Sequence, residues 1–554
     1  MKAGELRKSS ESLLQGLYNE RISFWAHWRE LANYILPRRY KWLITANEAR
    51  RGAPINQYII DSTGTRAARN LASGMLSGIT SPSRPWFELK LDITDDDPAS
   101  EVNIWLATVR ERMMRVFAES NFYTSMAIHF FDLVVFGTGV SIIYEDFDDV
   151  INLQNPAAGE YYCALSPKNT INTVYREFTK TISQLVAQFS KENTSPDVQR
   201  MFEQGGINLT REIIVCHAIE PNLPSPGAPP ARFKYRELYW EKGKNEPEVL
   251  LVRGINEWPC MATRWDVVSN DAYGRSPGMD ALGFIKQLQQ ETKRKAQAID
   301  KMVNPPLLAD IQLKNQPASS IPGGITYVAG LGTNTGLKPI YQVMPPIQEL
   351  KEDIAEIQAT IKDTFFNDLF LTITNLQTVR SAAEIDARRE EKLMLLGPVL
   401  ERFQNEALDP AIERVFGIMS RLKLFPPAPA AIAGKPLQVE YSSILAEAQK
   451  ATATGGIERM FSMAGSLAGV NPEALDNIDF DKAIDRYAEL LSVPPDIIRS
   501  SAAVGKLRDA RSKQQQQQAA LQQTLPAVKG AQVLAQTPMN NGQSALDQIM
   551  GNSQ

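Results

Sequence analysis

Two helical patterns between residues 344 and 425 constrain the fold of this chain more than any other feature. In the first pattern an apolar residue recurs every three or four positions, and in the second it does so from Leu393 onward, which predicts in each case a helix with one apolar stripe. The stripes consist of Ile347, Leu350, Ile354, Ile357, Ile361 and Phe365 in the first pattern, and of Ile385, Leu393, Leu396, Leu400, Phe403 and Ala407 in the second. Residues 371–384 between them are too polar and too rich in β-branched side chains to continue either helix. On this segment alone, two core helices joined by a surface loop are favoured over a loop held in an open space.

The part of the chain before these helices predicts a mixed domain. Residues 1–140 carry amphipathic helical patterns, and the following stretch carries the β-branched and aromatic runs that are typical of strands. Strands are expected at 141–147, 160–166, 171–178, 211–220, 231–241, 248–255 and 260–265, with one short helix at 182–189. The fold class is therefore α+β, mainly helical.

A further long helix over 282–303 ends at consecutive prolines, because proline cannot continue a helix. A Gly- and Pro-rich insert with strand and turn signals follows, and the helical pattern resumes at 346–370. Two long helices therefore bracket a small β-type module. Beyond residue 425, proline breaks alternate with helical pieces up to 510 and predict a small α-domain. The Gln-rich residues 511–554 are either disordered or a helix that is stable only against copies of itself.

Some residues are predicted to be architectural. Gly274 lies in a turn before the 282–303 helix, where a glycine is free to adopt a positive φ. Gly397-Pro398 should kink the second helix of the 344–425 segment. Four tryptophans are expected in the core: Trp86, Trp105, Trp258 and Trp265.

Charge and cysteine content exclude several classes. The 554 residues have a net charge of −4, so no basic surface for nucleic acid or anionic lipid is indicated. The odd number of widely spaced cysteines, Cys163, Cys216 and Cys260, favours reduced thiols in a cytosolic compartment. The N-terminus lacks the apolar region of a signal peptide, and no apolar run reads as a membrane span.

Motifs for catalysis are missing. The chain has no P-loop, no GxGxxG after a strand, no HExxH and no GxSxG, and its three histidines are too scattered for a zinc site. Acidic residues at 95–97 and at 145–149 could hold a divalent ion for phosphodiester cleavage, but turns and solvated strand ends explain them better. A Cys163–His217 nucleophile pair lacks an orienting group. We therefore expect no enzyme activity, no cofactor and no bound metal.

Several strings in sequence order carry a family resemblance. They are RISFWAHWRELANYILP (21–37), DSTGTRAARNLASGMLSGITSPSRPWF (61–87), FDLVVFGTG (131–139), RWDVVSNDAYGRSPGMDAL (264–282) and SAAEIDARREEKLMLLGPVLERFQNEALDPAIERVF (381–416). Together with the 344–425 helix pair, they resemble the portal, or head-to-tail connector, proteins of short-tailed double-stranded DNA phages. The similarity covers about residues 10–425; beyond 430 it fades, and the Gln-rich tail departs from the family pattern.

The resemblance implies a closed ring, commonly of twelve subunits, at one vertex of the capsid in the virion, assembled in the host cytoplasm. It implies a wing (1–277), first stem helix (278–303), clip (304–344), second stem helix (345–368), tunnel loop (369–384), kinked wing helix (385–425), crown (426–510) and C-terminal tail (511–554). The implied partners are double-stranded DNA passing without sequence preference, the terminase motor, tail or adaptor proteins, and capsid and scaffolding proteins, with no membrane. The ring would serve packaging and ejection of DNA.

Charged residues of the two stem helices are candidates for contacts between subunits. The cations Lys286, Lys293, Arg294 and Lys295 could pair with Glu349, Glu352, Asp353 and Glu356 of a neighbour, while Lys362 lies near the end of the second helix. Any one of these charges could equally belong to a solvated helix face. Twelve chains would carry about −48, a surface that lets duplex DNA pass without gripping it.

In the tunnel loop the candidates for contact with DNA are Thr374, Asn375, Gln377, Thr378 and Arg380. Arg380 is the best candidate for touching a phosphate, although a surface arginine at a helix start explains it equally well. Two other functions stay open: a non-viral helical scaffold or adaptor, and a metal-dependent nuclease that uses the acids at 145–149.

Overall fold

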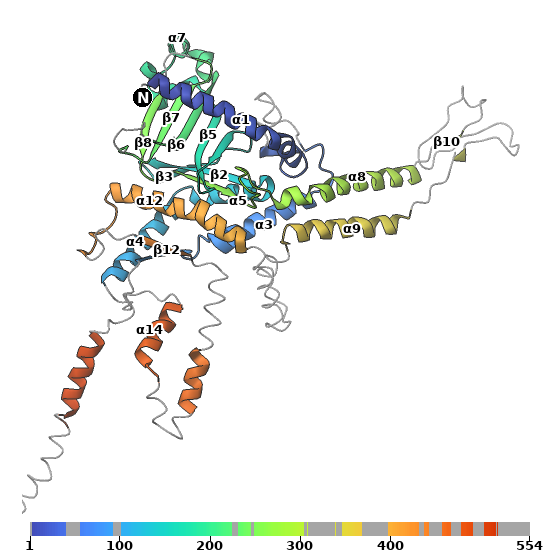
Figure 1. The fold of residues 1–554 in the computed structure, drawn as a ribbon. Helices are drawn as coiled ribbons and strands as arrows, with labels where there is room; N and C mark the ends of the chain where they lie inside the picture. The colour runs from blue at the N-terminus through green and yellow to red at the C-terminus, as the bar shows by residue number, and fades with distance from the viewer. Residues whose placement is uncertain are drawn as a thin grey trace, which may run out of the picture. The chain divides into compact units, whose positions relative to one another are not determined.

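The computed structural model describes residues 3–39, 56–91, 101–223, 231–244, 249–303, 307–308, 338–339, 346–367, 397–430, 437–441, 457–466, 478–490, 503–516 and 518. Two compact units are present (Figure 1). The first comprises Met1–Trp86, Arg112–Phe425 and Ser442–Leu445; the second comprises Phe87–Glu111, Pro426–Tyr441 and Ala446–Gln554. Each unit is described by itself.

The first unit holds two antiparallel sheets. The five-stranded sheet has the order β4-β5-β6-β7-β8, and the three-stranded sheet has the order β3-β2-β9. The strands are β2 (Thr138–Asp146), β3 (Val150–Gln154), β4 (Tyr161–Leu165), β5 (Ile171–Thr181), β6 (Glu212–Pro221), β7 (Tyr235–Glu241), β8 (Leu251–Ile255) and β9 (Cys260–Arg264). All seven strands predicted from the sequence are present, and the pattern missed only β3 among the strands of these two sheets.

The described part of the first unit also contains several helices. They are α1 (Ala3–Tyr34), α3 (Thr63–Ile79), α5 (Phe122–Phe136), α6 (Ile182–Phe189), α7 (Pro196–Gln204), α8 (Pro277–Val303), α9 (Ile347–Thr364) and α12 (Asp409–Arg421). Short 3₁₀ turns lie at Pro37–Arg39 (η1), Lys191–Asn193 (η3) and Gly206–Thr210 (η4), and a π-helical turn, η6 (Gln404–Leu408), directly precedes α12. Helix α4 (Glu101–Glu119) contributes residues to both units. The mixed, mainly helical fold class is confirmed.

Two apolar clusters fix helices on the five-stranded sheet. Helix α1 crosses one face (Figure 1), where its Leu17 packs with Tyr162, Tyr175 and Trp240. The buried Arg21 of α1 donates to the carbonyl oxygens of Gly159 and Tyr161 at 2.7 and 2.8 Å, so its charge is hydrogen-bonded where water is excluded. In the second cluster, the helices α6 and α7 pack Ile182, Leu185, Phe189 and Val198 against Phe178, Val215, Tyr239 and Leu250.

At the junction between α5 and β2, two glycine backbones lie close together. Gly137 ends α5 with a φ of 77°, and its backbone lies so close to Gly274 that a Cβ on either residue would come within 2.3 Å of the other's carbonyl oxygen. Gly274 itself does not use its freedom to adopt a positive φ. It is needed because two backbones touch there, and not because the turn is left-handed.

The helix before α12 differs in detail from the expectation. The predicted kink at Gly397-Pro398 falls where the described part of this helix begins, so it stays a prediction. Further along, η6 has π-helical geometry and buries Glu406. Such a turn places one extra residue in the helix and changes the direction of the side chains around it.

Three of the four tryptophans expected in the core are buried, namely Trp86, Trp258 and Trp265. Trp105 is half-buried, and its indole N–H donates to the carbonyl oxygen of Pro426 at 3.1 Å. Both residues belong to the second unit.

The second unit contains a strand pair that the sequence did not predict. Strand β1 (Phe87–Leu91) pairs antiparallel with β12 (Leu437–Tyr441), although only helical pieces were expected after residue 425. Helix α14 (Phe480–Leu490) lies in this unit, and its Asp481 forms a bidentate ion pair with Arg508. Among the described helices of the whole chain, none combines the length and apolar character that crossing a lipid bilayer requires.

Candidate assembly surface on helices α8 and α9

Helices α8 and α9 lie side by side and project from the first unit as an arm (Figure 1). The start of α8 is fixed on the end of α5. The Ser276 hydroxyl accepts from the N–H of Met279 at 3.1 Å, which caps the helix, and donates to the carbonyl oxygen of Val135 at 2.7 Å. Pro277 occupies the first turn, where its missing N–H has no cost. A Cβ on Gly278 would meet that same carbonyl oxygen at 2.8 Å, so only glycine allows this approach.

The residues at the start of α3 are hydrogen-bonded to both arm helices. The buried side chain of Gln289 on α8 accepts from the N–H groups of Ile60 and Asp61 at 2.6 and 2.8 Å and donates to the Asp61 carbonyl oxygen. On α9, the Gln358 amide donates to the Asp61 carboxylate at 2.8 Å, and the N–H of Thr63 donates to its other oxygen. Three elements that are far apart in sequence are thereby fixed at the base of the arm.

Within the described residues, few contacts support the outer half of the arm. The buried residues of α8 end at Gln289, and from residue 290 to 303 its side chains are half-buried or exposed. The exposed ones include apolar side chains, of which Val303 is 72% accessible and Met302 46%. On α9 an isoleucine row (Ile354, Ile357 and Ile361) faces inward. Exposed apolar groups on a projecting element are typical of a surface that another molecule covers.

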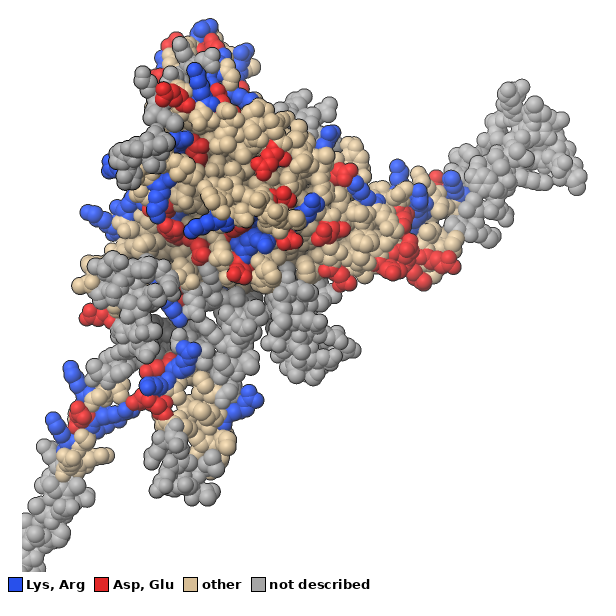
Figure 2. All heavy atoms as spheres, in the orientation of Figure 1, with Lys and Arg blue, Asp and Glu red and all other residues tan. Residues whose placement is uncertain are grey.

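The charges of the arm are separated by side. Figure 2 shows Lys and Arg gathered along the α8 side and Asp and Glu along the α9 side. The exposed cations of α8 are Lys293, Arg294 and Lys301, with Lys295 half-buried; the exposed acids of α9 include Glu349, Glu352, Asp353 and Glu356. Within the described residues, no ion pair joins the two sets. The arm thus offers one predominantly basic and one predominantly acidic side, with Asp300 on α8 and Lys351 and Lys362 on α9 as exposed exceptions.

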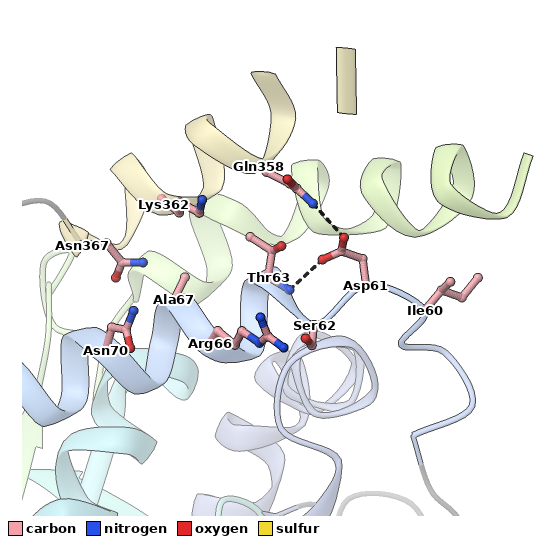
Figure 3. Close-up of a pocket in the computed structure, with 10 residues that line it drawn as sticks. All are labelled: Ile60, Asp61, Ser62, Thr63, Arg66, Ala67, Asn70, Gln358, Lys362 and Asn367. Carbon is pink, nitrogen blue, oxygen red and sulfur yellow. Dashed lines mark hydrogen bonds between the residues drawn. The ribbon is translucent and has the colours of Figure 1, made fainter. Parts of the chain in front are cut away.

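The predicted site residues have different outcomes. Lys286 does not face an α9 acid of its own chain: its ammonium pairs with Glu30 of α1 at 2.6 Å and lies over the ring of Tyr34. Lys362 lines a pocket beside α3 that no sequence pattern indicated (Figure 3). All five tunnel-loop candidates at 374–380 lie outside the described residues. Of the 304–344 module, the described part is an antiparallel pair, β10 (Leu307–Leu308) with β11 (Lys338–Pro339).

The acidic group at 145–149 forms a turn. The Asp146 carboxylate accepts from the N–H groups of Asp148 and Asp149 at 2.9 and 3.1 Å, which stabilises the hairpin between β2 and β3. In the part of the chain that the structure describes, no group of three or more His, Cys, Asp or Glu is arranged to hold a metal ion. The other acidic run, 95–97, lies outside it.

Burial makes Cys163 and His217 unsuited to act as a nucleophile pair. Burial raises the pKa of the Cys163 thiol to about 12, which suppresses the nucleophilic thiolate. Burial lowers the pKa of His217 to about 4, against the opposing effect of its hydrogen bond with Glu237. His217 also accepts from Arg176 at 3.0 Å, so it belongs to a polar network inside the first unit.

Comparisons with known proteins identify the family to which the chain is similar. The sequence pattern of the family described as "Bacteriophage head to tail connecting protein" matches residues 7–498. The chain is 41% identical over 510 residues to a "Probable portal protein" of Bordetella phage BPP-1, covering 91% of each chain. It is also 41% identical over 528 residues to the "Portal protein" of Salmonella phage epsilon15, covering 95% of this chain and 94% of that one.

The chain belongs to the bacteriophage head-to-tail connecting protein family. It is accordingly a structural protein of a phage particle and not an enzyme. The family resemblance seen in the sequence is confirmed, and the nuclease and non-viral scaffold alternatives are set aside.

Proposed function

We propose that this chain is the portal of a phage capsid, a ring of identical subunits at one vertex through which double-stranded DNA enters and leaves. The relatives named portal proteins support this function, because they match the chain over more than nine-tenths of its length. The family's usual number of twelve copies is part of the proposal. Terminase and, later, tail or adaptor proteins would dock on the ring, and capsid and scaffolding proteins would surround it.

One observation carries the assembly part of this proposal, namely the separation of charge on the α8–α9 arm. A rotationally symmetric ring requires two different faces on each subunit, because each face meets the other kind on its neighbour. The exposed Lys293 and Arg294 on α8, and the exposed Glu352 and Glu356 on α9, provide such a complementary pair of faces. Each exposed ion pair is worth under about 1 kcal/mol, but the contact repeats at every interface of a ring.

The remaining assignments follow from sequence order. Helices α8 and α9 are the stem, the 304–344 module between them is the clip that docks the motor and the tail, and 369–384 is the tunnel loop, whose Arg380 would touch DNA phosphates. The net charge of −4 per chain favours passage over retention of DNA. Contacts to phosphates from such a loop would not depend on base sequence.

The test uses charge reversal on the purified full chain, with native mass spectrometry and electron microscopy as readouts. Reversing the basic side (Lys293→Glu with Arg294→Glu) or the acidic side (Glu352→Lys with Glu356→Lys) should lower the fraction of rings at least tenfold at limiting protein concentration. Combining both reversals in one chain should restore rings, because the faces become complementary again. The control reverses Lys168 and Arg200, which are exposed and lie outside the arm.

Annular particles with a central opening wide enough for duplex DNA are the expected form of the unaltered chain. A protein that stays monomeric at all concentrations would refute the portal assignment. Rings that tolerate both single-side reversals would refute the arm as the subunit contact and leave the portal assignment standing.

A further inference from the structure

The two larger sheets of the first unit have four edges, which are formed by β4, β8, β3 and β9. An edge strand has a partner on one side only, so alternate backbone N–H and C=O groups point away from the sheet. Such groups are a template for a further strand, and most proteins close or cover them. Among the described residues three of these edges are closed, whereas β8, at the end of the five-stranded sheet (Figure 1), is open.

Side chains close the edges of β3 and β9. The Asn121 carboxamide accepts from the Leu153 N–H at 2.8 Å and donates to the Leu153 carbonyl oxygen at 2.9 Å, which are the two bonds that a neighbouring strand would make. On β9 the Glu406 carboxylate accepts from the N–H of Arg264 at 3.0 Å, and all five residues of this strand are buried. Neither edge can accept a further strand.

The edge of β4 is closed by two buried side chains. Arg21 of α1 donates to the Tyr161 carbonyl oxygen at 2.8 Å, and the Tyr273 hydroxyl accepts from the N–H of Cys163 at 3.1 Å. Tyr161 and Cys163 are two residues apart, so both bonded groups lie on the side of β4 that faces away from β5. This edge is therefore occupied as well.

The register shows which backbone groups of β8 point outward. Successive residues of β7 bond alternately to β6 and to β8. Just after β7, the Lys242 N–H donates to the Ile214 carbonyl oxygen at 3.0 Å, so the even-numbered residues of β7 bond to β6 and the odd-numbered ones to β8. Odd-numbered residues of β8 lie opposite the odd-numbered residues of β7. The N–H and C=O groups of Val252 and Gly254 therefore point away from the sheet.

These outward groups are exposed. Within the part of the chain that the structure describes, no residue donates to them or accepts from them. Val252 is 43% accessible and Leu251 37%, and Arg253 and Gly254 are exposed as well. Strand β8 is thus an edge on which both the backbone and two apolar side chains are open to another molecule.

The segments that adjoin β8 in the sequence are not suited to fill this edge. Residues 224–230 and 245–248 lie outside the described residues. The first segment, between β6 and β7, has four prolines among seven residues, and proline has no N–H to donate to a ladder. The second, between β7 and β8, has too few residues to turn and run back along β8.

A second copy of the chain is also unsuited, if the subunits form the proposed ring. From its two larger sheets it can offer only another β8, because their other edges are closed. A contact between two β8 strands uses the same surface on both partners and gives a dimer with a two-fold axis, whereas a ring needs two different faces. This step rests on the proposed function; the open edge itself does not.

Arg253 indicates the charge of the occupant. Its Nε donates to the buried Glu237 carboxylate on β7, and its two terminal nitrogens bond to no described residue. A carboxylate on a strand beside β8 would reach these nitrogens in the bidentate geometry that arginine favours. Apolar β-branched side chains on that strand would cover Leu251 and Val252.

We propose that the outer edge of β8 binds an extended segment of a different protein, which adds an antiparallel sixth strand to the sheet. The segment carries an Asp or Glu opposite Arg253 and β-branched residues beside it. Its main chain bonds to Val252 and Gly254 and supplies the affinity, while the side chains supply the specificity.

Hydrogen exchange of the purified full chain, resolved to single amides, tests whether the edge is open. The amides of Val252 and Gly254 should exchange at least about tenfold faster than those of Arg253, which faces β7, and Leu153, whose edge is closed. Slow exchange of Val252 and Gly254, in monomers or in rings, would show that this chain covers the edge itself and would overturn the proposal.

A synthetic peptide of nine residues, with valine and threonine alternating about a central glutamate, is the probe for the occupant. It should bind the full chain and slow the exchange of the Val252 and Gly254 amides. A central lysine should weaken binding at least about tenfold. N-methylation of the two residues that flank the glutamate, whose N–H groups face β8, should do the same. N-methylation of the glutamate itself, whose N–H faces away, is the matched control and should change binding less than about twofold.

The variant Val252→Pro removes an outward N–H without breaking a bond to β7. It should weaken peptide binding at least about tenfold and leave the thermal midpoint nearly unchanged, because proline is tolerated at such edge positions. The control Val252→Thr keeps the N–H and the β-branched shape and should bind as the unaltered chain does. If Val252→Pro does not fold, the N-methylated peptides make the same test on the unaltered chain.

The outcomes separate this inference from the proposed function. Absence of peptide binding at millimolar concentration, or binding that the N-methylated peptides and Val252→Pro do not weaken, would overturn the inference and leave the portal assignment standing. Failure to form rings would overturn the portal assignment and not the open edge. Dimers that Val252→Pro abolishes would assign the edge to a second copy of the chain instead.

Discussion

The buried ion pair between Arg264 of β9 and Glu406 of η6 should be the main contact that holds the three-stranded sheet to the helix that contains η6. Glu406 accepts from the backbone N–H of Arg264 at 3.0 Å and from its Nε at 3.2 Å, and the two side chains are only 3% and 5% accessible. Arg264 also donates to the Asp271 carbonyl oxygen at 3.0 Å. Its third nitrogen donates to Glu406 and to the carbonyl oxygen of Asn169, so each of the three guanidinium nitrogens has an acceptor inside the protein.

Removing the carboxylate leaves a buried positive charge without a counter-charge. Breaking a buried pair in this way costs about 3–5 kcal/mol, so Glu406→Ala should lower stability by that amount. At about 2 °C per kcal/mol for a large domain, the midpoint of thermal unfolding should fall by about 6–10 °C. Glu406→Gln retains shape and an acceptor and should cost roughly half as much.

Tryptophan fluorescence is a suitable readout because Trp265 follows Arg264 and is itself buried. A double-mutant cycle with Arg264→Met and Glu406→Leu should show a coupling of at least about 1.5 kcal/mol, since two apolar residues leave no orphaned charge. The control, Glu203→Ala at the exposed pair with Lys191, should not move the midpoint. A change of less than about 1 kcal/mol for Glu406→Ala would refute the reasoning.

Three other predictions follow from the interior of the first unit. Burial lowers the pKa of His129 to about 3 and that of His217 to about 4, whereas an unfolded chain protonates both near 6.5. Because the unfolded state binds the extra protons, the free energy of unfolding should fall as pH drops below about 6.5, by up to about 1.4 kcal/mol per pH unit and histidine. The variant His129→Gln should therefore show a smaller change of the thermal midpoint between pH 7 and 5 than the unaltered chain. Gly274→Ala should destabilise the fold by more than about 3 kcal/mol, because the added Cβ would collide with the Gly137 carbonyl oxygen. The control Gly16→Ala, at an exposed position of α1 with open space around it, should be neutral or stabilising by up to about 1 kcal/mol. Equal shifts of the thermal midpoint in the two variants would contradict the close approach of Gly274 and Gly137. Burial raises the pKa values of the Cys163 and Cys216 thiols to about 12 and also raises the pKa of Cys260. A thiol reagent at pH 8 should therefore modify none of the three cysteines in the folded chain and all three in denaturant. Rapid labelling of the native protein would contradict the burial of these thiols.

Local sequence patterns were sufficient to predict most helices and strands. The periodic apolar residues of α1, α5, α8 and α9 and the β-branched runs of the two sheets were visible because side-chain burial repeats with the period of the element. The family also followed from sequence, since five strings in a fixed order identify it. Strand β12 was missed because it is stabilised by β1, which is more than three hundred residues away, and a short strand has little signal of its own.

The site was only partly visible in the sequence. The charged residues of the arm were identified, but their partners were not: Lys286 pairs with Glu30, which no spacing rule connects to it. The pocket was invisible because its walls come from two helices separated by almost three hundred residues. The surroundings of Asn367 were likewise not visible in the sequence: its buried side-chain oxygen has no hydrogen-bond partner among the described residues.

The sequence by itself determined the kinds of element, the class of fold and the phage family, because these depend on periodicity and on ordered strings that persist in any chain of this type. The tertiary structure decided which charges meet, which glycines are required and which polar atoms remain unsatisfied. Those properties are set by distances between segments remote along the chain, and hydrogen bonding, burial and charge pairing all change steeply over a few ångströms.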